Sequence, residues 1–223
     1  MMKMPSQTVI SVVIISGKKQ VMTELGEVPV PFEVVIDRSA GLGLARNNGA
    51  RRAKNNLIVF VNDDVKLDRK VWNIVLATKD REMTLPLIDV NNRTGGQFAN
   101  SRVLAIHKKD FWSLGGFDES LKVSCEDRDL YYRARRHLFT FRLIPFEYIT
   151  HIPHPIRESN IHKSIQGIRD RAKVFSDYAV RHPELFSLDF TPRIKQLQAK
   201  FFLIYSVYLL WFIIKKPFGR RKL

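Results

Sequence analysis

Short segments that are apolar at nearly every position, with Ser11 and Glu33 as exceptions, recur along the first third of the chain. They cover residues 9–15, 32–36 and 57–61, and each is followed by polar or turn-forming residues. Strands that are apolar throughout, instead of alternating with polar positions, are typical of parallel sheets covered on both faces. The pattern therefore predicts three buried strands of an α/β fold.

A helix is predicted between the second and third of these strands. Leu42, Ala45, Gly49 and Ala53 recur there at spacings of three and four, which gives a helix one face of mainly small residues. Such a face can lie close against a sheet. Strand, helix and strand together form the βαβ unit.

Further elements follow along the chain with less regular patterns. We expect a helix over residues 68–79, a strand and a short helix before a Gly-Gly turn within 101–120, a helix over 127–137, one or two closing strands within 139–151, and an amphipathic helix over 158–181. A chain of 223 residues with 45% hydrophobic content can bury one substantial core and carry an appendage.

Cysteine and charge narrow the range of functions. The single cysteine, Cys125, excludes an internal disulfide and a multi-cysteine zinc site, and we expect it to be a small buried hydrophobe. Eight Lys or Arg and no acid follow from Arg193 onward, which is more than half of the net charge of +15. This charge favours anionic lipid, nucleic acid or phosphorylated substrates as partners. No nucleic-acid recognition motif accompanies it, so nucleic acid is not expected.

The glycines at 41 and 43 raise the question of a phosphate-binding loop. The dinucleotide fingerprint needs a third Gly or Ala three residues after the second, and this chain has Arg46 there. Asp37, Arg38, Ser39 and Ala40 also separate the loop from its strand, and no Gly-Lys-Ser/Thr follows. Dinucleotide and P-loop functions are therefore disfavoured.

Two acidic groups stand at the ends of predicted elements. "NDD", residues 62–64, ends the third strand, and "CEDRDL", residues 125–130, opens a helix. Carboxylates at the carboxyl edge of an α/β sheet suit Mg²⁺ or Mn²⁺ that bridges a diphosphate, and one aimed into a cleft could accept a proton from a hydroxyl. Each group could equally be a solvated turn or a helix cap.

The order and spacing of four motifs decide between these alternatives. "GLGLARNNGARRAKNNLIVFVNDD", "GGFDES", "CEDRDLYYRARR" and "ITHIPHP" follow one another in the sequence. This series resembles the GT-A-fold glycosyltransferases of family 2, which are nucleotide-sugar enzymes, over roughly residues 8–155. The resemblance implies a GT-A fold, Rossmann-like and mostly parallel with flanking helices, and a transferase that inverts the anomeric carbon.

The resemblance also implies a divalent metal, Mn²⁺ or Mg²⁺, and a nucleotide-diphosphate sugar donor. Asp64 would coordinate the metal, with Asn62 or Asp63 near the donor's ribose or the metal's waters. His151 is similar to a histidine that completes the metal shell in some members, and His154 competes for that role. Asn62 stands where the usual motif begins with Asp, so the last carboxylate would carry the metal.

The remaining roles concern the acceptor and the nucleotide. Asp127 would be the general base, and Gly116, Asp118 and Glu126 would border the acceptor and the donor sugar. Arg46 would reach the nucleotide or its phosphates. The family has a further strand and helix before this helix, and here they are missing. Either Asp37 serves as the nucleotide-contacting acid, or that acid is absent.

The pattern of apolar and basic residues in the carboxyl-terminal tail predicts that the tail contacts a membrane. Residues 201–214 are an apolar run flanked by lysines, about 21 Å long if helical, against roughly 30 Å of bilayer hydrocarbon. A helix of this kind suits the interface of an anionic membrane, and a buried or oligomer-interface helix is the alternative. We expect a catalytic domain over 1–155, a helical extension over 156–192 and a membrane-associating helix over 193–223.

Two functions from different classes follow. The first is a membrane-associated glycosyltransferase of glycan biosynthesis, cytoplasmic and peripheral at the inner face of the cell membrane, which acts on a lipid-linked or membrane-assembled acceptor. The second is a non-catalytic basic protein that binds membrane or nucleic acid and keeps a degenerate transferase fold. Transfer or hydrolysis of a nucleotide sugar distinguishes the two.

Overall fold

The computed structural model describes residues 10–17, 21–89, 97–99, 101–121 and 125–152. The predicted helix at 158–181, the predicted membrane helix and His154 lie outside these residues. Among the helices that are described, none combines the length and the apolar character needed to cross a bilayer.

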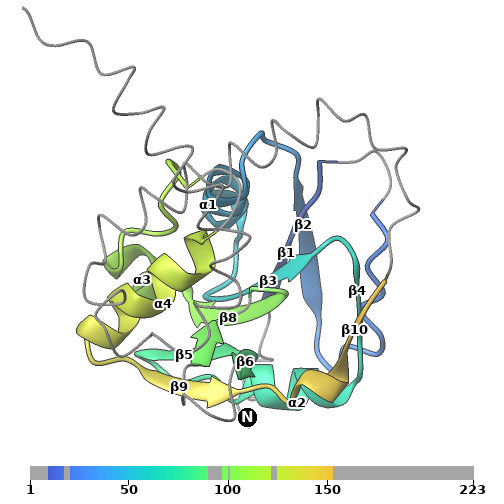
Figure 1. The fold of residues 1–223 in the computed structure, drawn as a ribbon. Coiled ribbons are helices and arrows are strands. Elements are labelled where there is room, and N and C mark those ends of the chain that lie inside the picture. The colour runs from blue at the N-terminus through green and yellow to red at the C-terminus, as the bar shows by residue number, and fades with distance from the viewer. Residues whose placement is uncertain (1–9, 18–20, 90–96, 100, 122–124, 153–223) are drawn as a thin grey trace, which may run out of the picture. The chain divides into compact units, whose positions relative to one another are not determined.

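Helices separate groups of one to four strands along the described chain (Figure 1). The strands are β1 (Ile10–Ile15), β2 (Phe32–Asp37), β3 (Leu57–Asn62), β4 (Val65–Leu67), β5 (Glu82–Leu85), β6 (Leu87–Asp89), β7 (Gln97–Ala99), β8 (Val103–His107), β9 (Thr140–Leu143) and β10 (Ile149–His151). The helices are α1 (Leu42–Arg52), α2 (Lys70–Leu76), α3 (Lys108–Ser113) and α4 (Glu126–Arg136), with a 3₁₀ turn η1 (Phe146–Tyr148).

Six strands form the main sheet in the order β2-β1-β3-β8-β5-β9. β1 pairs in parallel with β2 and β3, and β5 pairs in parallel with β9, whereas β8 is antiparallel to both of its neighbours. The carboxyl ends of the five other strands therefore meet at one edge, together with the amino end of β8. The predicted α/β class and mostly parallel sheet are confirmed.

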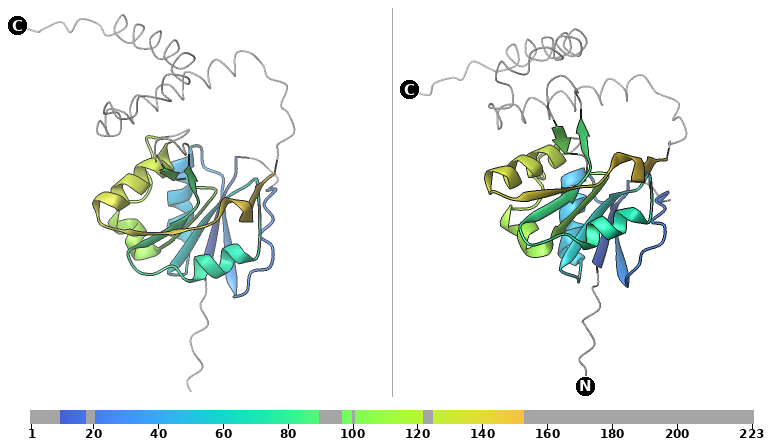
Figure 2. Two further views of the ribbon diagram at one scale, coloured as in Figure 1. Left: turned by 60° about the horizontal axis from the view of Figure 1, so that its bottom comes forward. Right: turned by 90° about the horizontal axis from the view of Figure 1, so that it is seen from below.

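Each face of this sheet is covered by its own hydrophobic cluster. Figure 2 shows helices on both sides of the sheet. One cluster joins alternate residues of the strands to α1, α3 and α4, and includes Phe60, Phe111 and Leu130. The other joins the remaining strand positions to α2 and β4, and includes Val59 and Trp72. Burial on both faces explains why β3 is apolar from Leu57 to Val61. The prediction of a buried strand is wrong for β2, which lies at the edge of the sheet and leaves Phe32, Val34 and Ile36 39–46% exposed.

Helix α1 lies as close to the sheet as its small residues predicted. A Cβ atom added to Gly49 would overlap the Val13 side chain of β1, so only glycine fits there without a shift. Ala50 and Ala53 are also buried in this interface. The predicted strand–helix–strand unit is confirmed, and it fixes α1 over the end of the sheet that carries the candidate site.

Two parts of the fold differ from or add to the sequence pattern. Helix α2 ends at Leu76, shorter than the predicted 68–79, and Thr78 Oγ1 donates a hydrogen bond to Val75 O at 2.6 Å. The described part of the β1–β2 connection, residues 21–31, contains no helix and runs along β4, where Glu24 N donates to Val65 O at 2.9 Å.

Candidate active site

Polar side chains gather at the edge where the carboxyl ends of β1, β2 and β3 meet. Open α/β sheets bind ligands at this edge. Most of the residues predicted from the sequence come from it: Asp37 ends β2, Asn62 ends β3, and Asp63 and Asp64 form the turn from β3 into β4. The amino end of β8 brings Ser101 to the same edge.

A buried guanidinium lies at the centre of this region. Arg46 on α1 donates to Glu126 Oε1 at 2.5 Å, to Asn62 Oδ1 at 3.0 Å and to Ser101 Oγ at 2.8 Å. The Arg46 and Glu126 side chains are only 2% and 4% exposed. One side chain therefore ties together α1, the end of β3, the start of α4 and the segment before β8.

Asp127 is held by hydrogen bonds from two backbone amides and one hydroxyl. Ser101 N and Ser101 Oγ both approach Asp127 Oδ2, at 3.1 and 3.2 Å, and Arg128 N donates to Asp127 Oδ1 at 2.9 Å. Glu126, Asp127 and Asp129 all stand in the first turn of α4, where the helix dipole favours negative charge. The carboxylate of Asp127 is therefore held in place at the start of α4.

The neighbouring Glu126 is electrostatically unusual. Burial raises the pKa of its carboxyl, the Arg46 charge lowers it in part, and the charge of Asp127 raises it further. Glu126 Oε2 is buried with no hydrogen-bond partner. The structure thus directs Glu126 against Arg46 inside the protein.

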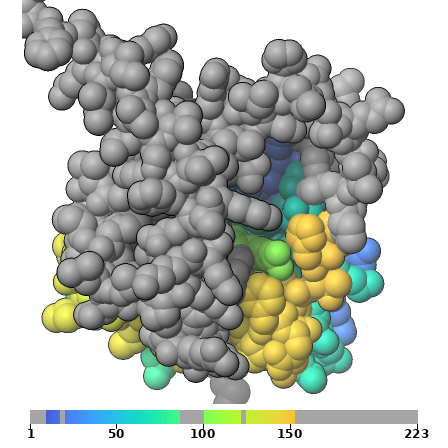
Figure 3. All heavy atoms as spheres, viewed as in Figure 1, coloured from blue at the N-terminus to red at the C-terminus, as the bar shows by residue number. Residues whose placement is uncertain are grey.

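Asp64 and His151 form a second polar pair, in the turn that follows Asn62 and on the strand β10. The short antiparallel pairing of β4 with β10 places His151 opposite Val65, and Ile152 N donates to Asp64 O at 2.7 Å. As a result, His151 Nε2 lies 3.3 Å from Asp64 Oδ2. The His151 side chain is 42% exposed, and Figure 3 shows orange atoms of the chain near residue 150 on the surface beside the teal atoms of β4.

The donor atoms of this pair suit a hard divalent cation. Adjacent ligands of an octahedral ion with bonds of about 2.1 Å are about 3 Å apart, close to the separation observed here. Among the residues that the structure describes, no group of three or more His, Cys, Asp or Glu side chains could hold a metal. Mg²⁺-like ions need fewer, since one or two protein ligands with substrate phosphates suffice.

The other two carboxylates that the sequence assigns to the nucleotide-sugar donor, those of Asp63 and Asp37, accept hydrogen bonds from protein groups. Asp63 Oδ2 accepts a hydrogen bond from Ser16 Oγ at 2.5 Å, just after β1. Asp37 Oδ2 accepts from Arg52 Nη2 at 2.7 Å, and its Oδ1 accepts from Ser39 N at 2.9 Å. Asp37 therefore fastens the end of β2 to the segment that follows it, and Asp63 joins the turn after β3 to the residue after β1.

The "GGFDE" turn packs between α1 and α4. Asn47 Nδ2 donates to Phe117 O at 2.9 Å, and Phe117 N returns a bond to Asn47 Oδ1 at 2.9 Å. Gly116 has a φ of 70°, and a Cβ there would lie 2.8 Å from Asn47 Oδ1. Asp118 Oδ1 accepts a bond from Ser120 N at 2.8 Å. The backbone conformation and the close contact with Asn47 thus favour glycine at position 116, and Asn47 holds the turn through Phe117.

Sequence reasoning missed Ser16 and Ser101. Ser16 could have been found, because it follows a predicted strand at the ligand-binding edge. Ser101 carries no such signal, since it precedes an antiparallel strand whose direction the sequence pattern did not reveal. Arg46 binds Asn62, Glu126 and Ser101, and Ser101 extends this network to Asp127.

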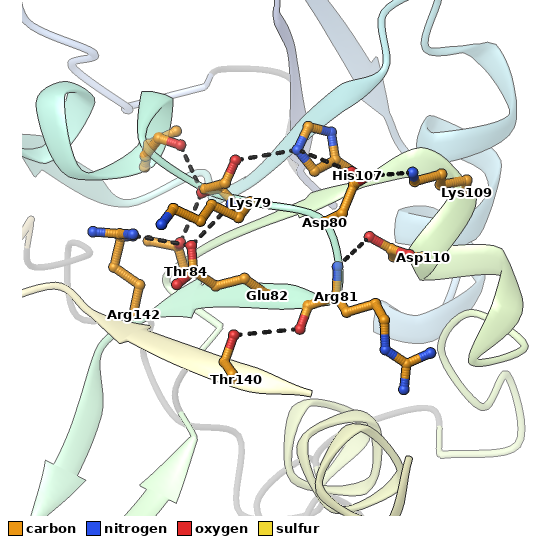
Figure 4. Close-up of polar contacts among 12 residues, drawn as sticks. Lys79, Asp80, Arg81, Glu82, Thr84, His107, Lys109, Asp110, Thr140 and Arg142 are labelled. Carbon is orange, nitrogen blue, oxygen red and sulfur yellow. Dashed lines mark hydrogen bonds and ion pairs between the residues drawn. The ribbon is translucent and has the colours of Figure 1, made fainter. Parts of the chain in front are cut away.

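The opposite end of the sheet has a polar cluster of a different kind (Figure 4). Asp80 accepts a hydrogen bond from Lys109 Nζ at 2.5 Å, and Arg81 N donates to Asp110 Oδ2 at 2.8 Å. His107 pairs with Leu57, the first residue of β3, so this cluster lies away from the carboxyl edge. Its bonds fix the turn between α2 and β5 onto α3.

No protein-family model matches the sequence, and no curated protein matches it. The fold is similar to the crystal structure of GalNAc-T7 with UDP, GalNAc and Mn²⁺, with a TM-score of 0.53 and 13% identity over 77% of this chain and 48% of that chain. It is also similar to the mannosyltransferase PcManGT from Pyrobaculum calidifontis in complex with GDP-Man and Mn²⁺.

For this second structure the TM-score is 0.50 and the identity 12%, over 77% of this chain and 64% of that chain. The chain therefore spans about half of the length of the first structure and less than two thirds of the second. At these identities the likeness shows the fold alone. The α/β fold of this chain is of the GT-A type.

Proposed function

We propose that the chain is a nucleotide-sugar-dependent glycosyltransferase of the family 2 kind that inverts the anomeric carbon. One observation carries this proposal. Asn62 at the end of β3 and Asp127 at the start of α4 share one network through Arg46 and Ser101, next to the Asp64 and His151 pair. A donor-binding carboxylate turn and a candidate base thus occupy the edge where such sheets bind ligands.

Asp64 and His151 would hold a divalent cation, Mn²⁺ or Mg²⁺. The bound ion would neutralise the charge that develops on the leaving diphosphate. The 3.3 Å separation of the two side chains and the exposure of His151 support this assignment. Asn62, Asp63 and Asp37 would lie on the nucleotide and ribose side, because all three end or follow parallel strands at the same edge.

Asp127 would act as the general base. It would take the proton of the acceptor hydroxyl while that oxygen forms a bond to the anomeric carbon, and the bond from this carbon to the diphosphate oxygen would break. The nucleoside diphosphate leaves with the bonding electron pair, and the new linkage has the inverted configuration. A positioned base contributes on the order of 10²- to 10⁴-fold. Gly116, Asp118 and the start of α4 would border the acceptor and the sugar.

The test is a screen of nucleotide diphosphates and their sugars for Mn²⁺-dependent thermal stabilisation. A ligand that binds only the folded protein raises its apparent stability. Asp64→Ala should abolish the metal-dependent part of the stabilisation and leave the fold intact. Glu24→Ala is the control, since Glu24 is an exposed carboxylate beside β4 that pairs with Lys66.

An unchanged metal dependence in Asp64→Ala would remove Asp64 from the site. If no nucleotide sugar stabilises the protein or is turned over, the chain is a binding protein with a degenerate transferase fold.

A membrane location at the inner face of the cell membrane is part of the proposal and rests on the sequence of the tail. Deletion from Lys195 onward should move the protein from the membrane fraction to the soluble fraction. Flotation with anionic and neutral liposomes separates charge-assisted docking from apolar insertion, because the basic residues matter only for the former. A truncated chain that unfolds would instead identify a core helix. The acceptor would be a lipid-linked or membrane-assembled glycan.

A further inference from the structure

We infer that Arg46 is a positioning residue, which fixes the carboxylate of Asp127 through Ser101 and does not bind the phosphates of the donor. The sequence pattern assigned Arg46 to the nucleotide, and the geometry points elsewhere. The effect on catalysis rests on the proposed function, whereas the effect on Asp127 and the missing contact with phosphate can be measured without it.

Three of the five N–H hydrogens of the guanidinium are already committed to protein groups. Arg46 Nη2 carries two hydrogens, and it donates to Asn62 Oδ1 at 3.0 Å and to Ser101 Oγ at 2.8 Å. Nη1 donates to Glu126 Oε1 at 2.5 Å, and the Phe117 ring lies under the guanidinium, 5.1 Å from its carbon to the ring centroid. With 2% of the side chain exposed, a phosphate could reach Arg46 only by breaking this arrangement.

The bond from Arg46 also determines where the Ser101 hydroxyl points. An arginine can only donate, so Ser101 Oγ accepts there and must direct its own proton elsewhere. Asp127 Oδ2 lies 3.2 Å from Ser101 Oγ and 3.1 Å from Ser101 N. Arg46 therefore makes Ser101 a double donor to a single carboxylate oxygen.

The carboxylate plane of Asp127 is fixed from both sides. Ser101 holds Oδ2, and Arg128 N holds Oδ1 at 2.9 Å. Glu126, the preceding residue, is anchored to the same guanidinium, so the first turn of α4 cannot rotate independently of α1. Arg46 also donates to Asn62, which precedes the turn that carries Asp64. The guanidinium of Arg46 therefore positions both the candidate base and this turn.

Four variants of the full chain test this inference. Arg46→Lys keeps the charge beside Glu126 but cannot reach three partners at once. Ser101→Ala removes the hydroxyl and keeps the amide, and Ser101→Thr keeps both. Arg51→Lys is the matched control, because Arg51 lies on the same helix with its side chain 53% exposed.

Hydrogen exchange at the residue 101 amide reports the hold on Asp127, and calorimetric titration with UDP or GDP in the presence of Mn²⁺ reports the donor site. In Arg46→Lys we expect exchange at residue 101 to rise about 10-fold or more, while the diphosphate Kd changes by less than about 3-fold. The kcat of transfer should fall about 100-fold, because small misplacements of reacting groups are costly.

Ser101→Ala should lose about 10-fold in kcat, as expected for a hydrogen bond to a charged group, with the diphosphate Kd unchanged. Ser101→Thr should restore the rate, and Arg51→Lys should leave all three quantities unchanged. A purely structural role would lower the melting temperature without this split between kcat and Kd.

A diphosphate Kd that rises 10-fold or more in Arg46→Lys, with unchanged exchange at residue 101, would overturn the inference and make Arg46 a donor ligand. If the wild type binds neither diphosphate and turns over no nucleotide sugar, the proposed function fails on its own. Exchange at residue 101 in Arg46→Lys, compared with Arg51→Lys, then still decides whether Arg46 orders Asp127. Should Arg46→Lys not fold, Ser101→Ala and Ser101→Thr supply the same comparison.

Discussion

The two ends of the main sheet each carry a cluster of acids and bases, and the clusters differ in burial. At the carboxyl edge, Arg46 and Glu126 are 2% and 4% exposed, whereas Lys109 and Asp80 at the opposite end are 57% and 62% exposed. Both pairs have an N···O distance of 2.5 Å. Distance alone therefore does not distinguish a structural tie on the surface from a buried network.

The difference appears in the direction in which the pKa of each acid is shifted. The hydrogen bond from Lys109 lowers the pKa of Asp80, while burial raises the pKa of Glu126 despite its arginine partner. Water solvates the first pair and is excluded from the second. The comparison shows that burial, and not the distance between the charged atoms, decides the direction in which the pKa of an acid shifts here, and perturbed pKa values cluster at functional sites.

Removing the buried cation should have the largest effect on stability. Arg46→Met leaves the Glu126 charge uncompensated in the interior, and we expect the free energy of unfolding to fall by about 3–5 kcal/mol. Lys109→Met, which breaks the exposed pair, should change stability little. Chemical denaturation of both variants checks this, and equal losses would show that burial does not separate the two clusters.

Removing the candidate base should affect the rate instead. Asp127→Asn preserves size and most hydrogen bonding but cannot accept a proton, so transfer should fall by about 10²-fold or more while donor binding survives. Steady-state kinetics and calorimetry measure the two quantities. Asp129→Asn is the control.

If Asp127 were only a helix cap, Asn would serve nearly as well and turnover would hardly change. A dead Asp129→Asn beside an active Asp127→Asn would move the base two residues along α4. Loss of donor affinity in Asp127→Asn would indicate a role in binding.

The candidate metal site at the carboxyl edge can be tested at its exposed residue, His151. His151→Ala should weaken Mn²⁺ binding by at least about 10-fold, since loss of an outer partner alone costs that much at metal sites. Titration with Mn²⁺ in the presence of a nucleoside diphosphate measures it. His154→Ala should bind Mn²⁺ like the wild type, and the reverse pattern would assign the ligand to His154.

The smallest effects concern pH and should have opposite signs at the two ends. Because the pKa of Glu126 is raised in the folded state, its contribution to stability is present below the ordinary Glu pKa of about 4.3 and is lost as pH rises through the raised value. The lowered pKa of Asp80 gives a contribution present above the ordinary Asp value and lost as pH falls.

The stability difference between wild type and Glu126→Gln should therefore shrink with rising pH, and that between wild type and Asp80→Asn should grow. Denaturation midpoints between about pH 2 and about pH 8, which extend about two units below both ordinary values and further above them, provide the test. The same slope in both variants would mean that the ion pair with Arg46 outweighs desolvation.

The sequence by itself determined the first three strands of the main sheet, the helix between β2 and β3 and the α/β class. Burial of β1 and β3 on both faces requires mainly apolar strand residues, and the close approach at Gly49 requires a small side chain, so both leave a local pattern. Where an apolar run ends, the chain leaves the core and polar residues follow. This change in polarity made Asn62, Asp64 and Asp127 recognisable as candidates.

Only the tertiary structure decided what these candidates touch. Arg46 and Glu126 are 80 positions apart and Arg46 and Ser101 are 55 apart, and a pairing over that distance leaves no periodicity in the sequence. Whether Arg46 faces a ligand or the interior depends on Phe117 and α4 closing over it. The approach of His151 to Asp64 likewise depends on the pairing of β4 with β10. Burial and partner choice are properties of the packed chain, because they arise where separate segments exclude water together.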